Sequence, residues 1–309
     1  MPPFLTIGIP NYNYARYIRK CIDSVTQLPD DDIEIVVCDN ASTDGSWEVI
    51  SGYTDARIVR HRHKTTIPPH ANFNSCLERA RGKYFKLLCS DDWIKPQLVS
   101  ALRVFDSRLD PDRALTYVGH RIDSANGDGS CITRASVDFG DRWINSRSDM
   151  RTRWACIDYA MTTACVLNTA IARKVGGYVI SMRPDGIIVS RLLTDPSFEF
   201  AVLTERSLAC VRLHGLNDRL NYSRFEVYRD EARFILPFLH CSNSSDERRY
   251  FELLLRMASA NALMGILYGT ISRRGNCSVR RGLEELRELR LLRRAVAGIP
   301  AALLKALPR

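Results

Sequence analysis

The sequence lacks the patterns that mark several common classes of protein. Its ten cysteines are scattered without a CxxC pair, which disfavours zinc ribbons and disulfide scaffolds and favours reduced, buried thiols. It has neither a GxGxxG fingerprint nor a GxxxxGK[ST] loop, so no glycine-rich phosphate cradle is expected. No run of about 18 apolar residues is free of charge, which argues against a membrane-spanning helix. No basic, apolar leader precedes the first strand-like run, so we expect no signal peptide and a cytoplasmic location.

The length and the net charge of the chain limit which folds and which partners remain possible. The 309 residues suffice for one large α/β domain with a helical addition. The formal net charge of +9 favours an anionic partner, such as a nucleotide, a nucleic acid or an acidic membrane surface. Zinc-ligand spacings and RNP-type aromatic patterns are missing from the sequence, so we expect no nucleic-acid partner.

Short β-type runs alternate with helical patterns over the first hundred residues, which predicts a mostly parallel sheet. We expect Pro10 to stop the first strand and Gly82 to end the third helix as a C′ residue. Residues 120–150 are rich in Gly, Asp, Ser and Arg and predict a long loop. The expected strands are 4–9, 33–38, 57–60, 84–89, 114–118, 163–167, 198–203 and 208–213. The expected helices are 17–25, 47–53, 73–80, 96–105, 171–175 and 185–193.

The chain becomes almost purely helical after about residue 220, which predicts a domain at residues 1–218 and a helical, basic region at residues 219–309. The end of that region carries a leucine stripe flanked by Arg287, Arg290, Arg293 and Arg294. Such a helix can lie on an anionic membrane surface, with the protein peripheral on its inner face. It can equally pack its stripe on the domain at residues 1–218, and both interpretations stay open.

Polar clusters follow three of the expected strands: Pro10-Asn11-Tyr12-Asn13, Asp39-Asn40 and Ser90-Asp91-Asp92. In an open α/β sheet, ligands bind beyond the carboxyl ends of the strands. The three clusters together therefore predict a ligand site at that edge.

Each cluster also has a purely structural interpretation. Tyr12 can stack on a base or fill a turn, and Asp39 can accept hydrogen bonds from a ligand or cap a turn. The adjacent carboxylates of Asp91 and Asp92 repel each other unless a cation or a proton separates them. With diphosphate oxygens they suit a divalent ion, although an acidic helix start before Pro96 would look the same.

Four segments resemble the family 2 glycosyltransferases: LTIGIPNYNYARYIRKCIDSV, IEIVVCDNASTDGSWEVI, NFNSCLERARGKYFKLLCSDDWIKP and VLNTAIARKVGGYVISMRPDGIIVSRLL. They span roughly residues 4–215 in the family's order. The resemblance implies the GT-A fold, a Rossmann-like mixed sheet flanked by helices, here with a helical C-terminal extension. It also implies inverting transfer of a sugar from a nucleotide-diphosphate donor, preferably a UDP-sugar, with Mg²⁺ or Mn²⁺. The expected acceptor is a sugar or a lipid-linked sugar in polysaccharide or glycolipid assembly.

The resemblance also implies roles for individual residues. Pro10, Tyr12 and Asn13 are expected around the nucleotide base, and Asp39 on the base or the ribose. Asp91 and Asp92 resemble the DxD-type element, with Asp91 on the nucleotide and either carboxylate on the metal. His214, in Arg212-Leu213-His214, resembles an element that reaches the metal or the diphosphate, although a structural histidine is the alternative.

Asp185 is expected to be the general base, because it follows Gly176-Gly177 and opens a helix as the family's base does. A plain helix N-cap is the alternative for this residue. The chain departs from the family at Cys89, where many members carry an acid, and at Pro184, where an acidic neighbour is usual. A catalytically silent nucleotide-sugar-binding protein therefore stays open. A nucleotidyltransferase, which needs a glycine-rich first loop, and a processive synthase, which needs a QxxRW element and membrane spans, are disfavoured.

Overall fold

The computed structural model describes residues 1–126, 130–132, 140–145, 162–181, 184–214, 224–242, 244–272, 279–289, 291 and 294. The chain divides into two compact units. The first comprises Met1–Ser146, Ala155–Ile180 and Pro184–Gly215, and the second comprises Arg147–Trp154, Ser181–Arg183 and Leu216–Arg309. The expected domain boundary after residue 218 lies outside the described residues. No helix within the described ranges is long and apolar enough to cross a bilayer.

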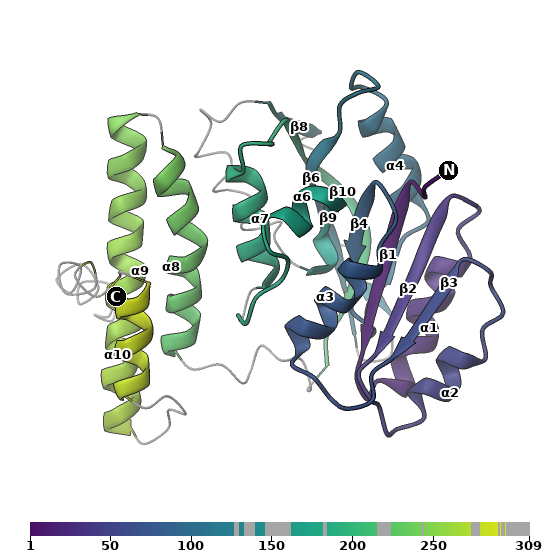
Figure 1. Ribbon diagram of the computed structural model, residues 1–309, viewed down its shortest axis with the longest axis horizontal. Helices are drawn as coiled ribbons and strands as arrows, with labels where there is room; N and C mark the ends of the chain where they lie inside the picture. Colours follow the sequence, from purple (N-terminus) through teal and green to yellow (C-terminus); the bar gives the residue numbers. More distant parts are fainter. Residues whose placement is uncertain are drawn as a thin grey trace. The chain divides into compact units, whose positions relative to one another are not determined.

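The first unit alternates strands and helices along its first hundred residues, as expected (Figure 1). The strands are β1 (Leu5–Asn11), β2 (Ile33–Asp39), β3 (Ile58–Arg62), β4 (Tyr84–Leu87), β5 (Trp93–Ile94), β6 (Leu115–Ala125), β7 (Cys131–Ile132), β8 (Asp141–Ile144), β9 (Cys165–Asn168) and β10 (Phe200–Arg212). The helices are α1 (Ala15–Thr26), α2 (Ser46–Ser51), α3 (Pro69–Arg79), α4 (Gln97–Asp106), the 3₁₀ turn η2 (Thr162–Ala164), α6 (Thr169–Lys174) and α7 (Pro184–Thr194).

The strands form one mixed sheet in the order β3-β2-β1-β4-β9-β6-β10-β5, with β7 paired to β6 and β8 to β10. Strands β3, β2, β1 and β4 run parallel, and so do β6 and β10, whereas β9 runs antiparallel between β4 and β6. The chain crosses from β3 over β2 and β1 to β4, so the strand order reverses at β1. Ligands of open α/β sheets bind at such a reversal, beyond the carboxyl ends of the strands.

Successive side chains of β1 point to opposite faces of the sheet. Leu5, Ile7 and Ile9 are fully buried in the main apolar cluster, which also takes the inward faces of α1 and α4. Gly8 lies on the opposite face, where a Cβ would come within 2.8 Å of the Cβ of Cys76 on α3. The absence of a side chain at Gly8 therefore lets α3 approach the sheet closely.

Two expectations about where elements end were wrong. Pro10 does not stop the first strand: β1 continues to Asn11, paired in parallel with β2. Gly82 is not a left-handed helix cap, because α3 already ends at Arg79. Gly82 instead lies so close to β1 that an added Cβ would meet the backbone nitrogen of Thr6 at 2.6 Å.

The region expected to be a long loop contributes strands. Part of it continues β6 to Ala125, and β7 and β8 follow; residues 127–129, 133–139 and 146–150 lie outside the described residues. The two strands expected at 198–203 and 208–213 are one strand, β10. Register shifts between Thr204 and Ala209 let β10 pass through the polar residues Glu205 and Arg206 without ending.

The second unit contains α8 (Arg224–Cys241), α9 (Ser245–Ser272) and α10 (Val279–Glu288), so the helical C-terminal extension is confirmed for the described residues. Phe238 of α8 stacks on Phe251 of α9 with ring centroids 5.6 Å apart. Leu286 of α10 is fully buried, and Arg294 forms an ion pair of 3.0 Å with Glu252 of α9. These contacts show that α10 packs on α9 within the second unit. They leave open whether the tail packs on the domain expected at residues 1–218 or binds a membrane, and most of the residues beyond α10 lie outside the described ranges.

Candidate functional site

The three polar clusters lie together at the carboxyl edge of the sheet. Asn11 and Asp39 end β1 and β2 opposite each other in the parallel register. The chain leaving β4 stays beside β1, since the backbone N–H of Leu88 donates to Gly8 at 2.8 Å. All eight residues expected at the site belong to the first unit. The residues that follow β1, β2 and β4 therefore lie at the same edge of the sheet.

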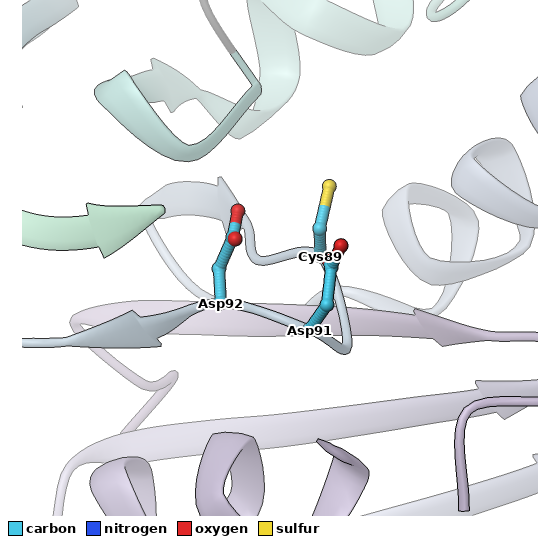
Figure 2. A group of neighbouring side chains, drawn as sticks. All are labelled: Cys89, Asp91 and Asp92. Atoms are coloured by element: carbon cyan, nitrogen blue, oxygen red, sulfur yellow. The ribbon is translucent and has the colours of Figure 1, made fainter. Parts of the chain in front are cut away.

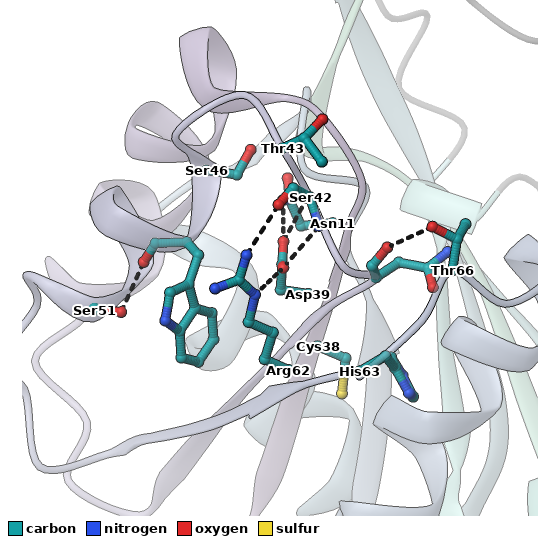
Figure 3. Close-up of polar contacts among 12 residues, drawn as sticks. Asn11, Cys38, Asp39, Ser42, Thr43, Ser46, Ser51, Arg62, His63 and Thr66 are labelled. Atoms are coloured by element: carbon teal, nitrogen blue, oxygen red, sulfur yellow. Dashed lines mark hydrogen bonds and ion pairs between the residues drawn. The ribbon is translucent and has the colours of Figure 1, made fainter.

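Asp39 is the centre of the first half of the site (Figure 3). Its carboxylate is fully buried and accepts hydrogen bonds from Asn11 Nδ2 at 2.9 Å and from Ser42 Oγ at 2.6 Å. Arg62 Nε lies 3.4 Å from the other carboxylate oxygen. Asn11 Oδ1 is buried and accepts no hydrogen bond from the described part of the chain. This cluster, which we call the Asp39 cluster (Asn11, Asp39, Ser42 and Arg62), thus presents one buried acceptor without a donor.

The neighbouring residues of the first loop differ in exposure. Pro10 is buried within β1, whereas Tyr12 is 47% exposed. Asn13 adopts a left-handed conformation with φ of 55°, which asparagine tolerates better than most residues. Its backbone N–H donates to Ser42 Oγ at 3.0 Å, and its Oδ1 accepts from Thr43 N at 2.9 Å. These bonds tie the loop after β1 to the loop after β2 and leave the Tyr12 ring accessible.

The second half of the site is the turn after β4, which carries Cys89, Asp91 and Asp92 (Figure 2). One ligand atom of each residue lies within 4.8 Å of the other two, a spacing that can hold a metal ion. The Cys89 thiol is partly exposed. Burial and the charges of Asp92, Asp91 and Asp185 raise the pKa of Cys89 well above its usual range. Without a cation nearby, the thiol is therefore protonated at neutral pH.

The two carboxylates of this turn have different partners. Both oxygens of Asp92 accept hydrogen bonds, one from the Thr163 hydroxyl and one from the backbone N–H of Arg212 at 3.0 Å. Burial and the Asp91 charge raise the pKa of Asp92 to about 8, against the opposing effect of those two donors. Asp91, which is partly exposed, faces His214 Nε2 across 2.9 Å. Asp92 is thus anchored to the protein, and Asp91 with His214 faces the space of the site.

Arg212 and His214 reach the turn from the end of β10. Arg212 is 5% exposed, and its Nε donates to the carbonyl of Asp91 at 3.1 Å. Its guanidinium lies over the Tyr17 ring at 4.7 Å and over the Trp93 ring at 5.1 Å. The His214 ring lies 5.0 Å from the Tyr17 ring. Aromatic contacts on α1 and β5 therefore fix the end of β10 against the Asp91-Asp92 turn.

Asp185 lies in the first turn of α7 and is 8% exposed. Its charge is among the causes that raise the pKa of Cys89, after burial and the charges of Asp92 and Asp91. The chain before α7 is fixed by α3: Gly177 has a φ of 62°, and Asn74 exchanges two hydrogen bonds of 2.8 Å with the Tyr178 backbone. This anchoring brings the start of α7 to the edge that carries Cys89.

The donors at the Asp91-Asp92 turn fit a divalent ion. Carboxylate oxygens suit Mg²⁺ and Mn²⁺, and an imidazole suits Mn²⁺ as well. Sequence reasoning missed Ser42 and Thr163 as site residues, and it named Asn11 and Arg212 only as members of larger motifs, without a role of their own. Asn11 and Arg212 stood beside residues that were selected, whereas nothing in the local sequence marks Thr163.

Comparison with curated proteins gives partial matches to bacterial glycosyltransferases. The chain is 34% identical over 163 residues to a chondroitin synthase of Pasteurella multocida, which is 52% of this chain but 16% of that protein. The hyaluronan synthase of Pasteurella multocida matches to the same extent. A UDP-Glc:alpha-D-GlcNAc-diphosphoundecaprenol beta-1,3-glucosyltransferase of Escherichia coli is 28% identical over 104 residues, 33% of this chain and 41% of that protein. The chain thus spans a small part of the length of the first two relatives.

Solved structures share the fold. S. aureus TarS 1-349 in complex with UDP-GlcNAc aligns with a TM-score of 0.69 at 14% identity, over 96% of this chain and 83% of that one. The mannosyltransferase PcManGT of Pyrobaculum calidifontis, in complex with GDP-Man and Mn²⁺, aligns with a TM-score of 0.57 at 13% identity, over 99% and 89%. The fold is therefore GT-A. Residues 6–175, more than half of the sequence, match the family described as Glycosyl transferase family 2, and the chain belongs to that family.

Proposed function

We propose that the chain transfers a sugar from a nucleotide-diphosphate donor, preferably a UDP-sugar, to an acceptor hydroxyl with inversion. The observation that carries the proposal is the convergence of the Asp39 cluster, the Asp91–His214 pair and Asp185 at the carboxyl edge of one sheet. Family membership and the UDP-sugar named for the Escherichia coli relative support it. The polysaccharide synthases and the lipid-linked acceptor among the relatives point to an acceptor in polysaccharide or glycolipid assembly.

The Asp39 cluster is the proposed site for the base and the ribose. A pyrimidine base offers an N–H donor, and Asn11 Oδ1 is a buried acceptor that takes no donor from the described residues. The exposed ring of Tyr12 can stack on the face of the base, with Pro10 and Asn13 shaping the loop that carries it. Asp39 orients the Asn11 amide and Arg62, and its charge favours donor groups of the ligand.

The metal would be held by Asp91 and His214, with Cys89 beside them. Asp92 is a poorer ligand because both of its oxygens already accept hydrogen bonds within the protein. A divalent ion bound there would neutralise the charge that grows on the leaving diphosphate. Arg212 holds the Asp91 carbonyl and so restricts the carboxylate to the direction of His214.

Asp185 is the proposed general base. Its place at the start of α7 lets it take the proton of the acceptor hydroxyl as that oxygen attacks the anomeric carbon. Attack from the face opposite the diphosphate inverts the configuration in a single displacement. A positioned general base contributes about 10²–10⁴-fold to the rate, which sets the loss expected when the base is removed.

The test is a screen of nucleotide sugars with Mn²⁺ or Mg²⁺, followed by two variants of carboxylates at the ends of α7. Asp185→Asn should lower transfer by about 10²-fold or more and leave binding of UDP with Mn²⁺ within a few-fold of the parent. The matched control is Asp195→Asn, which removes the ion pair to Lys174, keeps an oxygen that can accept from the Ser197 backbone N–H, and should keep its turnover.

The outcomes separate the candidate functions. Turnover retained by Asp185→Asn would show that another group takes the proton. If the parent protein instead binds a nucleotide sugar without transfer or hydrolysis, it is a catalytically silent binding protein. The departures from the family pattern at Cys89 and Pro184 leave that alternative open.

A further inference from the structure

A lysine is buried beneath the Asp91-Asp92 turn. Lys86 lies in β4 and is fully buried, although an ammonium loses its hydration there. Its Nζ donates to the carbonyl oxygen of Thr163 at 2.7 Å and contacts His120 Nε2 at 3.0 Å. An apolar side chain would fill this place in the sheet without the loss of hydration. The burial of a lysine here therefore needs an explanation.

The contacts define which of the two basic groups carries the charge. His120 Nδ1 lies 2.8 Å from the carbonyl oxygen of Arg121, so Nδ1 holds the imidazole proton and Nε2 accepts from Lys86. Burial and the lysine charge lower the pKa of His120 well below its usual range, so this imidazole is neutral. Burial lowers the pKa of Lys86 to about 8, and the lysine stays largely charged at neutral pH.

Thr163 connects this ammonium to the site. Its carbonyl accepts from Lys86 Nζ, and its hydroxyl donates to Asp92. The other oxygen of Asp92 holds the backbone N–H of Arg212, whose side chain holds the carbonyl of Asp91. A continuous series of hydrogen bonds thus runs from Lys86 through Thr163, Asp92 and Arg212 to Asp91.

We propose that Lys86 is a positioning residue for the metal–diphosphate site, acting through the carbonyl and hydroxyl groups of Thr163 on Asp92. The inference rests on the function proposed above, because it assigns Lys86 to the binding of a nucleoside diphosphate with a divalent ion. Lys86 holds η2 at the carboxyl edge through the carbonyl of Thr163, and the Thr163 hydroxyl holds the Asp92 carboxylate. Asp92 in turn holds the end of β10, which leads to His214, through the backbone N–H of Arg212.

A purely structural role would make a different prediction. If Lys86 only filled the sheet, its replacement would lower the melting temperature and leave the affinity of the folded protein for its ligand unchanged. A positioning role requires that the affinity fall, and that a change at Thr163 which spares the lysine have the same effect. Removal of a group that orients a metal ligand typically costs about 10–100-fold in metal affinity.

The experiment measures the affinity for UDP with Mn²⁺ by calorimetry, and Mn²⁺ binding by electron paramagnetic resonance, beside thermal unfolding. The variants are Lys86→Met, Thr163→Val, their combination, and Thr163→Ser, which keeps the hydroxyl. The matched control is Lys83→Met, beside the same strand, which removes a partly exposed ion pair to Asp106 and a cation–π contact with Tyr84. Thr163→Val provides the test if Lys86→Met does not fold.

We expect Lys86→Met and Thr163→Val each to weaken binding by about 10–100-fold. The double variant should be little worse than either single one, because both changes break the same series of bonds. Thr163→Ser and Lys83→Met should bind as the parent does. Parent-like affinity in either Lys86→Met or Thr163→Val would overturn the positioning role. A parent protein that binds neither UDP nor Mn²⁺ would instead overturn the proposed function itself.

Discussion

Replacing Arg212 by methionine tests how the Asp91-Asp92 turn is held in place. The change removes the guanidinium and keeps the backbone N–H that donates to Asp92. The side-chain contacts that disappear include the hydrogen bond of 3.1 Å to the Asp91 carbonyl and the contacts with the rings of Tyr17 and Trp93. The experiment therefore isolates what the buried side chain contributes.

The magnitude follows from those contacts. A hydrogen bond from a charged donor contributes about 1.5–3 kcal/mol, and each half-buried cation–π contact contributes about 0.5–1 kcal/mol. The gross loss is thus about 2.5–5 kcal/mol. Methionine recovers part of it, because the variant no longer buries a charge and still packs an apolar stem. We expect a net loss of about 2–4 kcal/mol in the free energy of unfolding, a large single-residue effect.

The assay is urea unfolding followed by tryptophan fluorescence, together with the affinity for UDP with Mn²⁺. Arg206→Met is the matched control on the same strand. Arg206 is 47% exposed and contacts Asp141 only at 3.5 Å, so its loss should stay below about 1 kcal/mol. We also expect at least a tenfold weaker affinity in Arg212→Met, because Asp91 loses the donor that orients it. If the two variants unfold at the same urea concentration and bind alike, Arg212 does not hold the turn.

Two further predictions follow from the pKa values at this turn. Alkylation of Cys89 by iodoacetamide at pH 7, followed by mass spectrometry, should be far slower than that of free cysteine, because burial and the charges of Asp92 and Asp91 raise its pKa; labelling at the rate of free cysteine would contradict this. For Asp92, the pKa of about 8 in the folded protein lies above the ordinary aspartate value of 3.8. Between these two pH values the metal-free folded protein therefore binds more protons than the unfolded chain. The stability advantage of the parent over Asp92→Asn in EDTA should therefore be complete below pH 4 and shrink as the pH rises to 8, by at most about 1.4 kcal/mol per pH unit. A constant advantage in melting temperature between pH 5 and 8 would refute the assignment.

The sequence sufficed to predict that Asp39 and Asp91 follow strands whose carboxyl ends lie at one edge of the sheet. Asp39 and Asp91 follow apolar runs, and the parallel register places the ends of such strands side by side. For its described part, the region 120–150 was predicted wrongly as a loop. Residues 120–125 of β6 and the strand β8 contain few apolar residues and are held by pairing with β10. Pairing with a distant strand overrides local pattern, and a single sequence does not display it.

The partners of Asp92 could not be predicted for a related reason. Thr163 and Arg212 lie 71 and 120 residues away from it in the chain. Neither has a local pattern that points to a carboxylate, because a hydroxyl and a backbone N–H are common to many residues. Only the folded sheet, which places η2 and the end of β10 beside the turn, selects these two donors. The resemblance identified the pair Asp91-Asp92, and the structure separates their roles.

That separation explains how a thiol can occupy position 89. The turn after β4 is anchored through Asp92, which accepts from Thr163 and Arg212, and through the Asp91 carbonyl, which accepts from Arg212 Nε. The Cys89 side chain takes no part in these bonds, and its backbone carbonyl accepts from Cys21 Sγ at 3.5 Å, a contact any residue could make. An acid at this position would add a third carboxylate within a few ångströms of two others and raise the repulsion in the metal-free protein. Cysteine avoids that repulsion while the geometry of Asp91 and His214 is kept, so the substitution changes what the site offers to a ribose or a metal without dismantling the turn.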